Sequence, residues 1–202
     1  MEIDLAAVIT AIGAIVVAWL GYNQYTKNKE TDYKIEKLKN EDKEKNKRRA
    51  DHSMIVYGEL WNLLIELKAD RGYIIQPHPL GHEELISVYF EVKNGGIEGM
   101  KSTIKNIKIE NIGAFSADLA KNSFMCIKDI TNEVHDKYVQ SIMAQSGSQT
   151  IVIKRLSNNE HKWIGNIFCE FLDKTEFDEK EVCEKMKNAA IKIQYILPEY
   201  KE

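Results

Sequence analysis

The chain has 202 residues, with 28 lysines and arginines against 31 aspartates and glutamates, and a formal net charge of −3. This balance argues against a nucleic-acid-binding protein, which usually carries a strong basic excess, so no specific nucleic acid is expected as a partner. Apolar residues make up 44% and charged residues 29%, which excludes a disordered chain and a multi-span membrane protein. Cys126, Cys169 and Cys183 lack the close spacing of a zinc ribbon or disulfide scaffold, so a reducing compartment fits better.

The N-terminal region contains an apolar run, LAAVITAIGAIVVAWL, over residues 5–20. Extended to residues 3–22 as a helix, it would cover about 30 Å, the thickness of the hydrocarbon core of a bilayer. We therefore expect a transmembrane anchor over residues 1–22, with the lipid bilayer as a partner and with anchoring side chains at Leu5, Ile9, Ile15, Trp19, Leu20 and Tyr22. A cleavable signal peptide and a buried core helix are the alternatives. The acidic leader at residues 1–4 disfavours the first, and the lack of a polar face disfavours the second.

Positive charge follows the apolar run and does not precede it. Lysines stand at positions 27, 29, 34, 37 and 39. The positive-inside rule then predicts a single-pass protein with its N-terminus outside and its C-terminal domain in the cytoplasm.

Residues 23–52 are expected to form a charged helical stalk, because they contain many good helix formers and no glycine or proline. Tyr33, Ile35 and Leu38 give only a weak coiled-coil seam. An alternative role for Lys45, Lys47, Arg48 and Arg49 is a patch that binds lipid or nucleic acid, although interleaved acidic residues weaken it.

A domain of α+β class is expected over residues 53–202. Ser53 is the predicted N-cap of a helix that ends within residues 69–72. Residues 72–76 and 85–92 then read as two strands of a hairpin, with Ile86, Val88, Phe90 and Val92 on one face of the second strand.

The second half of this domain is expected to add three strands and two helices. Residues 97–123 predict short helices and loops, and residues 124–130 a strand. A helix is expected over residues 131–144, with Val134, Tyr138 and Ile142 on one stripe. Residues 149–155 and 162–172 predict two further strands. A last helix should begin after Asp178 with a capping-box-like pattern and stop at Pro198. Runs of adjacent strands favour an antiparallel sheet.

This order of elements resembles a GAF/PAS-like sensory domain. The strings ADRGYIIQPH (residues 69–78) and WIGNIFC (residues 163–169) are similar to the first strand and a late pocket-side strand of such domains. The resemblance implies a central antiparallel sheet with a pocket on one face, covered by short helices, and with the N- and C-terminal helices packed on the other face. It also implies a homo-oligomer formed through those helices. The whole layout is similar to small phage and bacterial membrane proteins.

Several side chains are candidates for the wall or rim of a small-molecule pocket, although aromatic residues on strands more often fill a core. They are Tyr73, Ile75, His78, His82, Tyr89, Trp163 and Phe168. His78 and His82 flank a turn with Glu83 and Glu84 beside it, but this spacing does not secure a metal site. No cysteine is placed to hold a bilin, and the identity of a cofactor is left open.

No catalytic constellation is found, and the chain is expected to be a non-enzymatic, membrane-anchored sensor that binds a ligand or a partner. The alternative is a phage or mobile-element membrane protein, acting in lysis, exclusion or assembly, whose domain is a structural scaffold. A sensor predicts a cavity lined from residues 72–76, 85–92 and 162–172, whereas a scaffold predicts a solidly packed sheet face. An enzyme would require polar side chains converging in a cleft.

Overall fold

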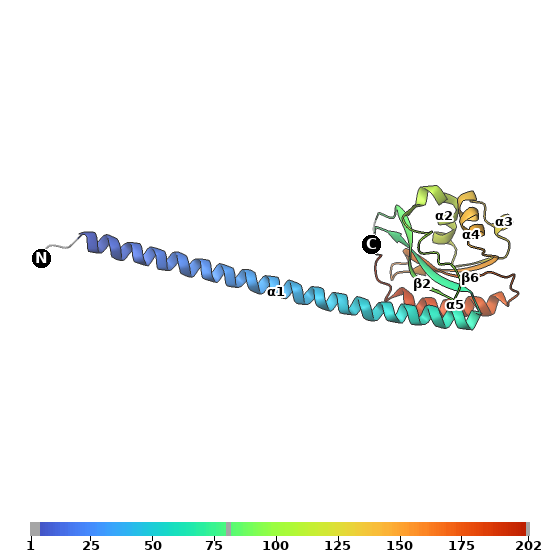
Figure 1. The fold of residues 1–202 in the computed structure, drawn as a ribbon, viewed down its shortest axis with the longest axis horizontal. Helices are drawn as coiled ribbons and strands as arrows, with labels where there is room; N and C mark the ends of the chain where they lie inside the picture. The colour runs from blue at the N-terminus through green and yellow to red at the C-terminus, as the bar shows by residue number, and fades with distance from the viewer. Residues whose placement is uncertain (1–4, 80–81, 201–202) are drawn as a thin grey trace. The chain divides into compact units, whose positions relative to one another are not determined.

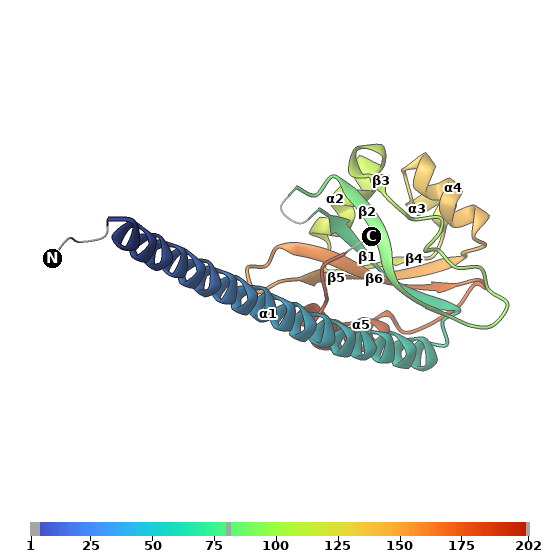
Figure 2. The same cartoon turned by 60° about the vertical axis from the view of Figure 1, so that its left-hand side comes forward.

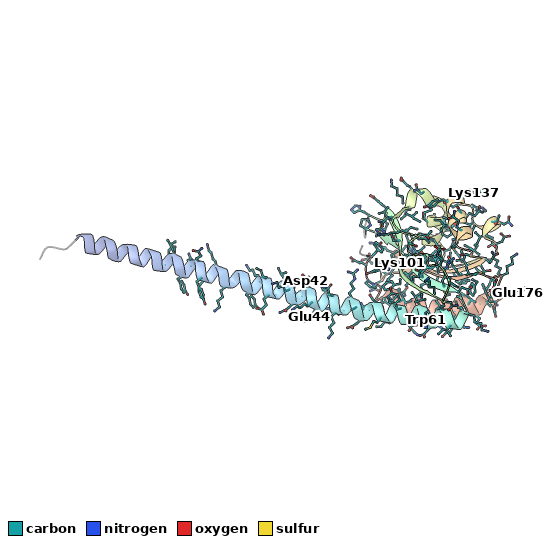
Figure 3. All side chains as sticks on the ribbon, in the orientation of Figure 1. Asp42, Glu44, Trp61, Lys101, Lys137 and Glu176 are labelled. Carbon is teal, nitrogen blue, oxygen red and sulfur yellow. The ribbon has the colours of Figure 1, made fainter. Side chains whose placement is uncertain are left out.

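The computed structural model describes residues 5–79 and 82–200, and the chain divides into two compact units, Met1–Arg49 and Ala50–Glu202. Helix α1 (Leu5–Leu67) supplies the described part of the first unit and the beginning of the second. Most of the described side chains of the first unit are exposed, among them Asp42 and Glu44, which are labelled in Figure 3. Nη2 of Arg48 lies 3.9 Å from Oε2 of Glu44, one helical turn earlier in α1.

Among the residues that the structure describes, no helix has a stretch both long and apolar enough to cross a membrane. This finding contradicts the predicted localisation, a single-pass membrane protein with its C-terminal domain in the cytoplasm, and it gives no support to the transmembrane anchor predicted over residues 1–22. The apolar run of residues 5–20 is by itself shorter than the ~20 residues that a span needs, and α1 continues from it into the polar residues 23–26 and then into charged turns. Trp19, Leu20 and Tyr22 are exposed. The leader at residues 1–4 and the side chains of Leu5, Ile9 and Ile15 lie outside what the structure describes.

Ser53 lies inside α1 and does not begin a helix, contrary to the sequence-based prediction. Residues 23–52 are helical and contain no glycine or proline, so nothing interrupts the backbone before Ser53. The helix ends where Lys68 adopts a left-handed conformation (φ 55°). There the N–H of Ala69 donates to the carbonyl of Leu64 over 3.0 Å, which satisfies one of the last helical carbonyls in the manner of a Schellman motif.

The second unit is built on a six-stranded sheet in the order β3-β2-β1-β6-β5-β4, in which every neighbouring pair is antiparallel. The predicted hairpin is present as β1 (Arg71–His78) and β2 (Leu85–Lys93). The second predicted pair is present as β5 (Thr150–Ser157) and β6 (Trp163–Phe171). The edges are formed by the short strands β3 (Ile107–Lys108) and β4 (Phe124–Ile127).

The predicted alternation along β2 is correct only in part. The pairing with β1 shifts between Ile74 and Ile75, so Ile74 faces Phe90 while Ile75 faces Val88, and Tyr89 is the extra residue of a bulge. Ile86 and Val88 therefore pack on one side of the sheet, and Phe90 and Val92 pack on the other. A strict period of two cannot anticipate an inserted residue.

Helices cover both faces of the sheet, as Figures 1 and 2 show. One face carries a 3-10 helix (Ile109–Ile112), α2 (Gly113–Lys121), α3 (Ile130–Glu133) and α4 (Lys137–Gln145). The other face carries α5 (Glu179–Gln194) and the last turns of α1. We call these two sides the roof face and the helix face.

The single helix expected over residues 131–144 is two helices, α3 and α4. The reason is Asp136, whose carboxylate accepts from the backbone N–H groups of Tyr138 and Val139 and so starts a new helix. Asp129 caps α3 in the same way, through Thr131 and Asn132. Tyr138, which was expected on the buried stripe, is exposed as a result.

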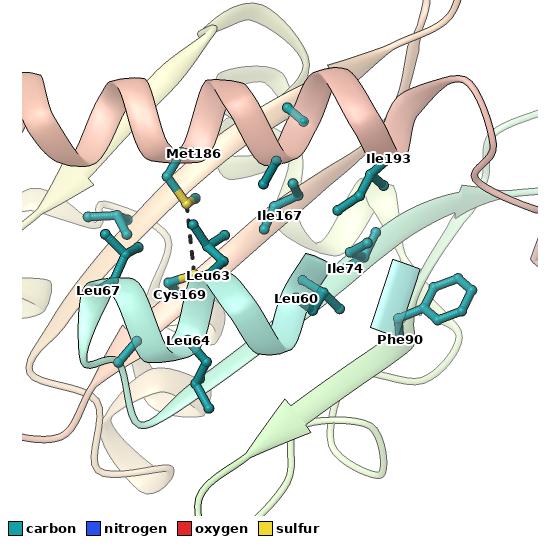
Figure 4. Packing of buried hydrophobic residues seen from close by; sticks show 14 of the residues in the cluster. Leu60, Leu63, Leu64, Leu67, Ile74, Phe90, Ile167, Cys169, Met186 and Ile193 are labelled. Atoms are coloured by element: carbon teal, nitrogen blue, oxygen red, sulfur yellow. Dashed lines mark hydrogen bonds between the residues drawn. The ribbon is translucent and has the colours of Figure 1, made fainter. Parts of the chain in front are cut away.

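The helix face holds one of two apolar cores. α5 begins at the predicted cap, with Asp178 accepting from the N–H of Lys180, and it ends at Gln194, before Pro198. Its stripe, which includes Met186 and Ile193, meets side chains of α1 and of the sheet (Figure 4), chiefly Leu60, Leu63, Leu64, Ile74, Ile167 and Cys169. Burial of such side chains stabilises the fold by about 1.5–3 kcal/mol each.

Candidate functional site

An apolar cavity lies on the roof face, between the sheet and the covering helices. Its floor comes from β1, β2 and β6, and its roof from the 3-10 helix, α2, α4 and the loop before β3. Its volume is about 30 Å³. Its lining residues are Tyr73, Ile75, Ile86, Met100, Ile104, Ile107, Ile112, Phe115, Val139, Ile142, Met143 and Phe168.

The cavity floor follows from the pairing of the two central strands. Tyr73 is opposite Phe168 in the β1–β6 ladder, so their side chains leave the sheet on the same side. Their rings stack with centroids 5.0 Å apart and an angle of 8° between planes. This stack forms a flat aromatic floor at the centre of the sheet.

The free volume is small compared with the sites that hold small organic molecules, which are about 300–1,000 Å³. A cavity needs about 10–15 Å³ of such free space to hold one water molecule, so a volume of about 30 Å³ has room for about two. Met100 and Met143 contribute flexible side chains to the wall, and methionine adapts easily to a changed cavity shape. The described conformation is therefore a nearly filled apolar site with adaptable walls.

A buried ion pair lies on the roof face at one end of the cavity. Arg71 on β1 and Glu170 on β6 are opposite one another in the ladder, and neither side chain is exposed. Nε of Arg71 lies 2.5 Å from Oε2 of Glu170. The other carboxylate oxygen accepts from the hydroxyl of Tyr73. Burial, and next the charge of Glu170, raise the pKa of the Tyr73 phenol well above its usual value.

The same ion pair fastens the loop that follows α4. Nη2 of Arg71 donates to the carbonyl of Ser146 over 3.1 Å and to Oγ of Ser148 over 2.7 Å. Ser148 in turn donates to Glu170 over 2.7 Å. The remaining donor, Nη1, reaches the carbonyl of Glu98 at 3.0 Å. The C-terminal end of α4 is thereby tied to the sheet through charge-assisted hydrogen bonds.

A second polar tie holds α2. Nδ2 of Asn166, a buried residue of β6, donates to the carbonyl of Leu119 over 3.0 Å. Its side-chain oxygen accepts from the indole N–H of Trp163 over 2.7 Å. Both covering helices α2 and α4 are thus fixed to the sheet by hydrogen bonds from buried polar side chains.

Three of the predicted pocket residues come together, and the others do not. Tyr73, Ile75 and Phe168 line the cavity, and Trp163 packs against the edge of the same core. His78 is held by Ser87, with 2.8 Å between Nε2 and Oγ, and stacks on Tyr200 rather than lining the cavity. Tyr89 packs against the helix-face core.

His82 is exposed in the loop between β1 and β2, and Leu80 and Gly81 of the same turn lie outside the described residues. His78 is buried, so the two histidines do not share one environment. Across the described ranges 5–79 and 82–200, no group of three or more histidine, cysteine, aspartate or glutamate side chains is arranged to hold a metal ion.

Sequence reasoning missed the polar residues of the site, namely Arg71, Glu170, Ser148 and Asn166. A signal for two of them was present, since Arg71 and Glu170 stand inside or beside strands that are otherwise apolar. A charged residue in a buried strand requires an opposite charge nearby. The pairing of β1 with β6, which brings the two together, joins residues 99 positions apart and could not be derived from the local pattern.

No known protein family matches the sequence, and no curated protein matches it. Solved structures match the fold. A GAF domain of Synechocystis sp. in its photoproduct state is 10% identical, with a TM-score of 0.59 over 71% of this chain and 90% of that one. The PixJ GAF domain of Thermosynechococcus elongatus, in its blue-light-absorbing form, is also 10% identical, with a TM-score of 0.58 over 72% and 84%. A phycocyanobilin-bound GAF domain from a cyanobacterial phytochrome is 15% identical, with a TM-score of 0.58 over 71% and 82%.

These likenesses show the fold: the second unit is a GAF-like α+β domain with a six-stranded antiparallel sheet. The expected GAF-like architecture is confirmed to that extent. The resemblance to small phage and bacterial membrane proteins finds no support in them.

Proposed function

We propose that the chain is a non-enzymatic, GAF-like regulatory module that binds a small apolar molecule between its sheet and the helices α2 and α4. The observation that carries this proposal is the cavity, which is lined entirely by apolar and aromatic side chains and lies on the sheet face that short helices cover. Two of the lining residues, Met100 and Met143, are methionines, whose flexible side chains can move aside without breaking a hydrogen bond. Ligand entry would displace part of the cover of the cavity and so change the outer surface of the domain.

A bilin, which one of the similar GAF domains holds, does not fit these residues. The cavity of about 30 Å³ is far smaller than the ~300 Å³ or more that a drug-sized ligand needs. Cys126 and Cys169 belong to the helix-face core, and Cys183 lies on α5. No cysteine therefore stands beside the cavity, and the proposed ligand is smaller than a bilin.

The proposal is tested by titrating the full chain with indole, a small planar apolar probe, while the methyl signals of Met100 and Met143 are followed by NMR. We expect these signals to shift and the thermal midpoint to rise. Met143→Ala should enlarge the site and tighten binding by about tenfold, since removing buried atoms leaves a cavity. Met186→Ala, which removes a buried methionine on the helix face, is the matched control and should leave the indole-dependent shifts of the Met100 and Met143 methyl signals unchanged. Unchanged methyl signals at saturating indole would refute the proposal.

A structural scaffold is the second candidate, and the near-complete filling of the cavity favours it. The helix face adds a surface for it: along α1, Met54, Trp61 and Ile65 follow one another at helical spacing and are 66%, 45% and 63% exposed. Trp61 is labelled in Figure 3. We propose that a second copy of the chain covers this stripe in a two-fold arrangement. Two results together would favour the scaffold. The chain would show no indole binding, and analytical ultracentrifugation would show a dimer for the unmodified chain and a monomer for Trp61→Glu.

A further inference from the structure

The segment after α5 returns to the sheet. Residues 195–200, which we call the C-terminal strap, run from the end of α5 up to the sheet (Figures 1 and 2), where they contact β1 and β2. Ile196 and Leu197 pack against the helix-face core. The strap then meets the ends of β1 and β2 through polar and aromatic contacts.

The first contact is a single hydrogen bond from a buried amide. Nε2 of Gln76 donates to the carbonyl of Pro198 over 3.0 Å. The Gln76 side chain is buried, with 5% of the residue exposed, and its Oε1 has no hydrogen-bond partner among the residues that the structure describes. A side-chain amide beside an extended chain can pair with both the carbonyl and the N–H of one residue. Proline has no N–H, so the strap satisfies only half of this amide.

The second contact is aromatic. The ring of Tyr200 stacks on His78 with centroids 4.2 Å apart and an angle of 19°, and it meets Tyr89 edge-on at 5.3 Å. His78 is held independently of the strap by Ser87, and Oγ of Ser87 also accepts from the N–H of Asn106 over 2.8 Å. The wall that receives the ring is therefore organised by the sheet itself.

Beside the same two tyrosines lies a surface cleft of about 570 Å³, which is also lined by Val88, Glu91 and Lys101. This cleft leaves room for a chain that continues past the position of Tyr200. The hydrogen bond from Gln76 and the ring contacts of Tyr200 with His78 and Tyr89 are individually modest interactions, so another extended segment with better complementarity can displace this part of the strap.

We propose that Gln76, His78 and Tyr89 form a docking groove for an extended peptide of a partner protein, and that the strap is a weaker occupant held in cis. The preferred peptide has a residue with a free N–H at the position of Pro198 and an aromatic ring at the position of Tyr200. The N–H satisfies Oε1 of Gln76, which the strap leaves buried and unpaired. The strap therefore competes with the partner and raises the concentration at which the partner binds. The groove is separate from the roof-face cavity, so this proposal does not rest on the proposed function.

The test uses the full chain with Tyr200→Ala, which loosens the strap, and two peptides, YILAEY and YILPEY, each with two added N-terminal lysines for solubility. Calorimetry and the NMR signals of the Gln76 side-chain amide report binding. We expect YILAEY to bind about fivefold more tightly than YILPEY, because only the first supplies the missing N–H. We also expect YILAEY to bind the Tyr200→Ala chain more tightly than the unmodified chain, and a peptide that ends in alanine, YILAEA, to lose binding.

One further variant and one further titration test whether the Gln76 amide is responsible for the difference in affinity. Gln76→Met retains the length of the side chain but removes the amide donor and the amide acceptor. It should therefore abolish the difference in affinity between YILAEY and YILPEY. If Tyr200→Ala lowers stability, the unmodified chain is titrated with YILAEY, and the Gln76 amide signals should still shift at higher peptide concentration. Equal affinity for the two peptides, or no binding at about 1 mM, would overturn the proposal. So would a strap-exchanged dimer in solution that Tyr200→Ala dissolves, because the groove would then belong to a second copy of the chain.

Discussion

The buried ion pair between Arg71 and Glu170 makes a sharp prediction about stability. Glu170→Gln keeps the shape of the side chain and an oxygen that can accept from Tyr73, but it removes the negative charge. The guanidinium of Arg71, which is fully buried, then retains only neutral partners: the carbonyls of Glu98 and Ser146 and the hydroxyl of Ser148. Leaving one charge of a buried pair uncompensated costs about 3–5 kcal/mol. We therefore expect the free energy of unfolding of the second unit to fall by about this amount.

The assay is urea unfolding of the full chain, followed by near-ultraviolet circular dichroism. A loss of about 3–5 kcal/mol lowers the urea midpoint by roughly 1–5 M, since the free energy of unfolding falls by about 1–3 kcal/mol per molar urea. The matched control is Glu160→Gln, which breaks the exposed pair between Glu160 and Lys162 and should leave the midpoint unchanged. The double variant Arg71→Met with Glu170→Leu should be more stable than Glu170→Gln alone, because it removes both charges. A midpoint for Glu170→Gln within error of the unmodified chain would refute the electrostatic reasoning.

Three further predictions follow from the same geometry. Gly165→Ala should cost about 1–3 kcal/mol in urea unfolding, because Gly165 has a φ of 150° and an added Cβ would lie 2.5 Å from the carbonyl oxygen of Ile75, whereas Gly95→Ala, in open space, should change little. Asp136→Ala should lower stability by about 1 kcal/mol and increase hydrogen exchange at the start of α4, because it removes the acceptor for two backbone N–H groups; equal exchange in the two proteins would contradict the capping role. Stability should fall as the pH rises above about 9–10, because the raised pKa values of Tyr73 and Cys169 keep their protons on the folded chain while the unfolded chain releases them. In the Tyr73→Phe variant the free energy of unfolding should decline less steeply between pH 9 and about 11. The same slope as in the unmodified chain would argue against a contribution from the Tyr73 phenol.

The strands of the GAF-like domain were predictable because each carries its own local signal. β-branched and aromatic residues, bounded by turn residues, identified β1, β2, β5 and β6 within a few positions. The errors arose where a single residue changes the pattern. Tyr89 inserts a bulge that moves Phe90 to the opposite face, and Asp136 ends one helix and begins another. Ser53 has the chemistry of a cap, but it lies in a helix that has no reason to stop there.

The candidate site was predictable only in its apolar half. Tyr73, Ile75 and Phe168 follow from strand alternation, which places their side chains on the roof face. The ties that hold the covering helices depend on contacts between distant parts of the chain, such as Arg71 with Ser148 and Asn166 with Leu119. Tyr89 was expected at the same pocket as an aromatic residue of a predicted strand, and His78 as part of a loop at the pocket rim, but both contact Tyr200 instead. The surroundings of a side chain near the end of a strand depend on bulges and on segments from distant parts of the chain that pack there, such as the C-terminal strap. Neither can be read from the local sequence pattern.

The two ties also indicate which covering helix moves when the roof-face cavity opens. Releasing the end of α4 would break the hydrogen bonds from Arg71 to Ser146 and Ser148 and from Ser148 to Glu170, each charge-assisted and worth about 1.5–3 kcal/mol. Releasing α2 would break the neutral hydrogen bond from Asn166 to Leu119, worth about 0.5–1.5 kcal/mol. By this comparison α4 is the fixed wall and α2 is the cheaper element to displace. Phe115, which α2 contributes to the lining, would move with it, and this enlarges the site next to the Tyr73–Phe168 floor. A ligand that enters by this route leaves the buried ion pair intact, so the cost of binding is set by apolar contacts and one amide rather than by an uncompensated charge.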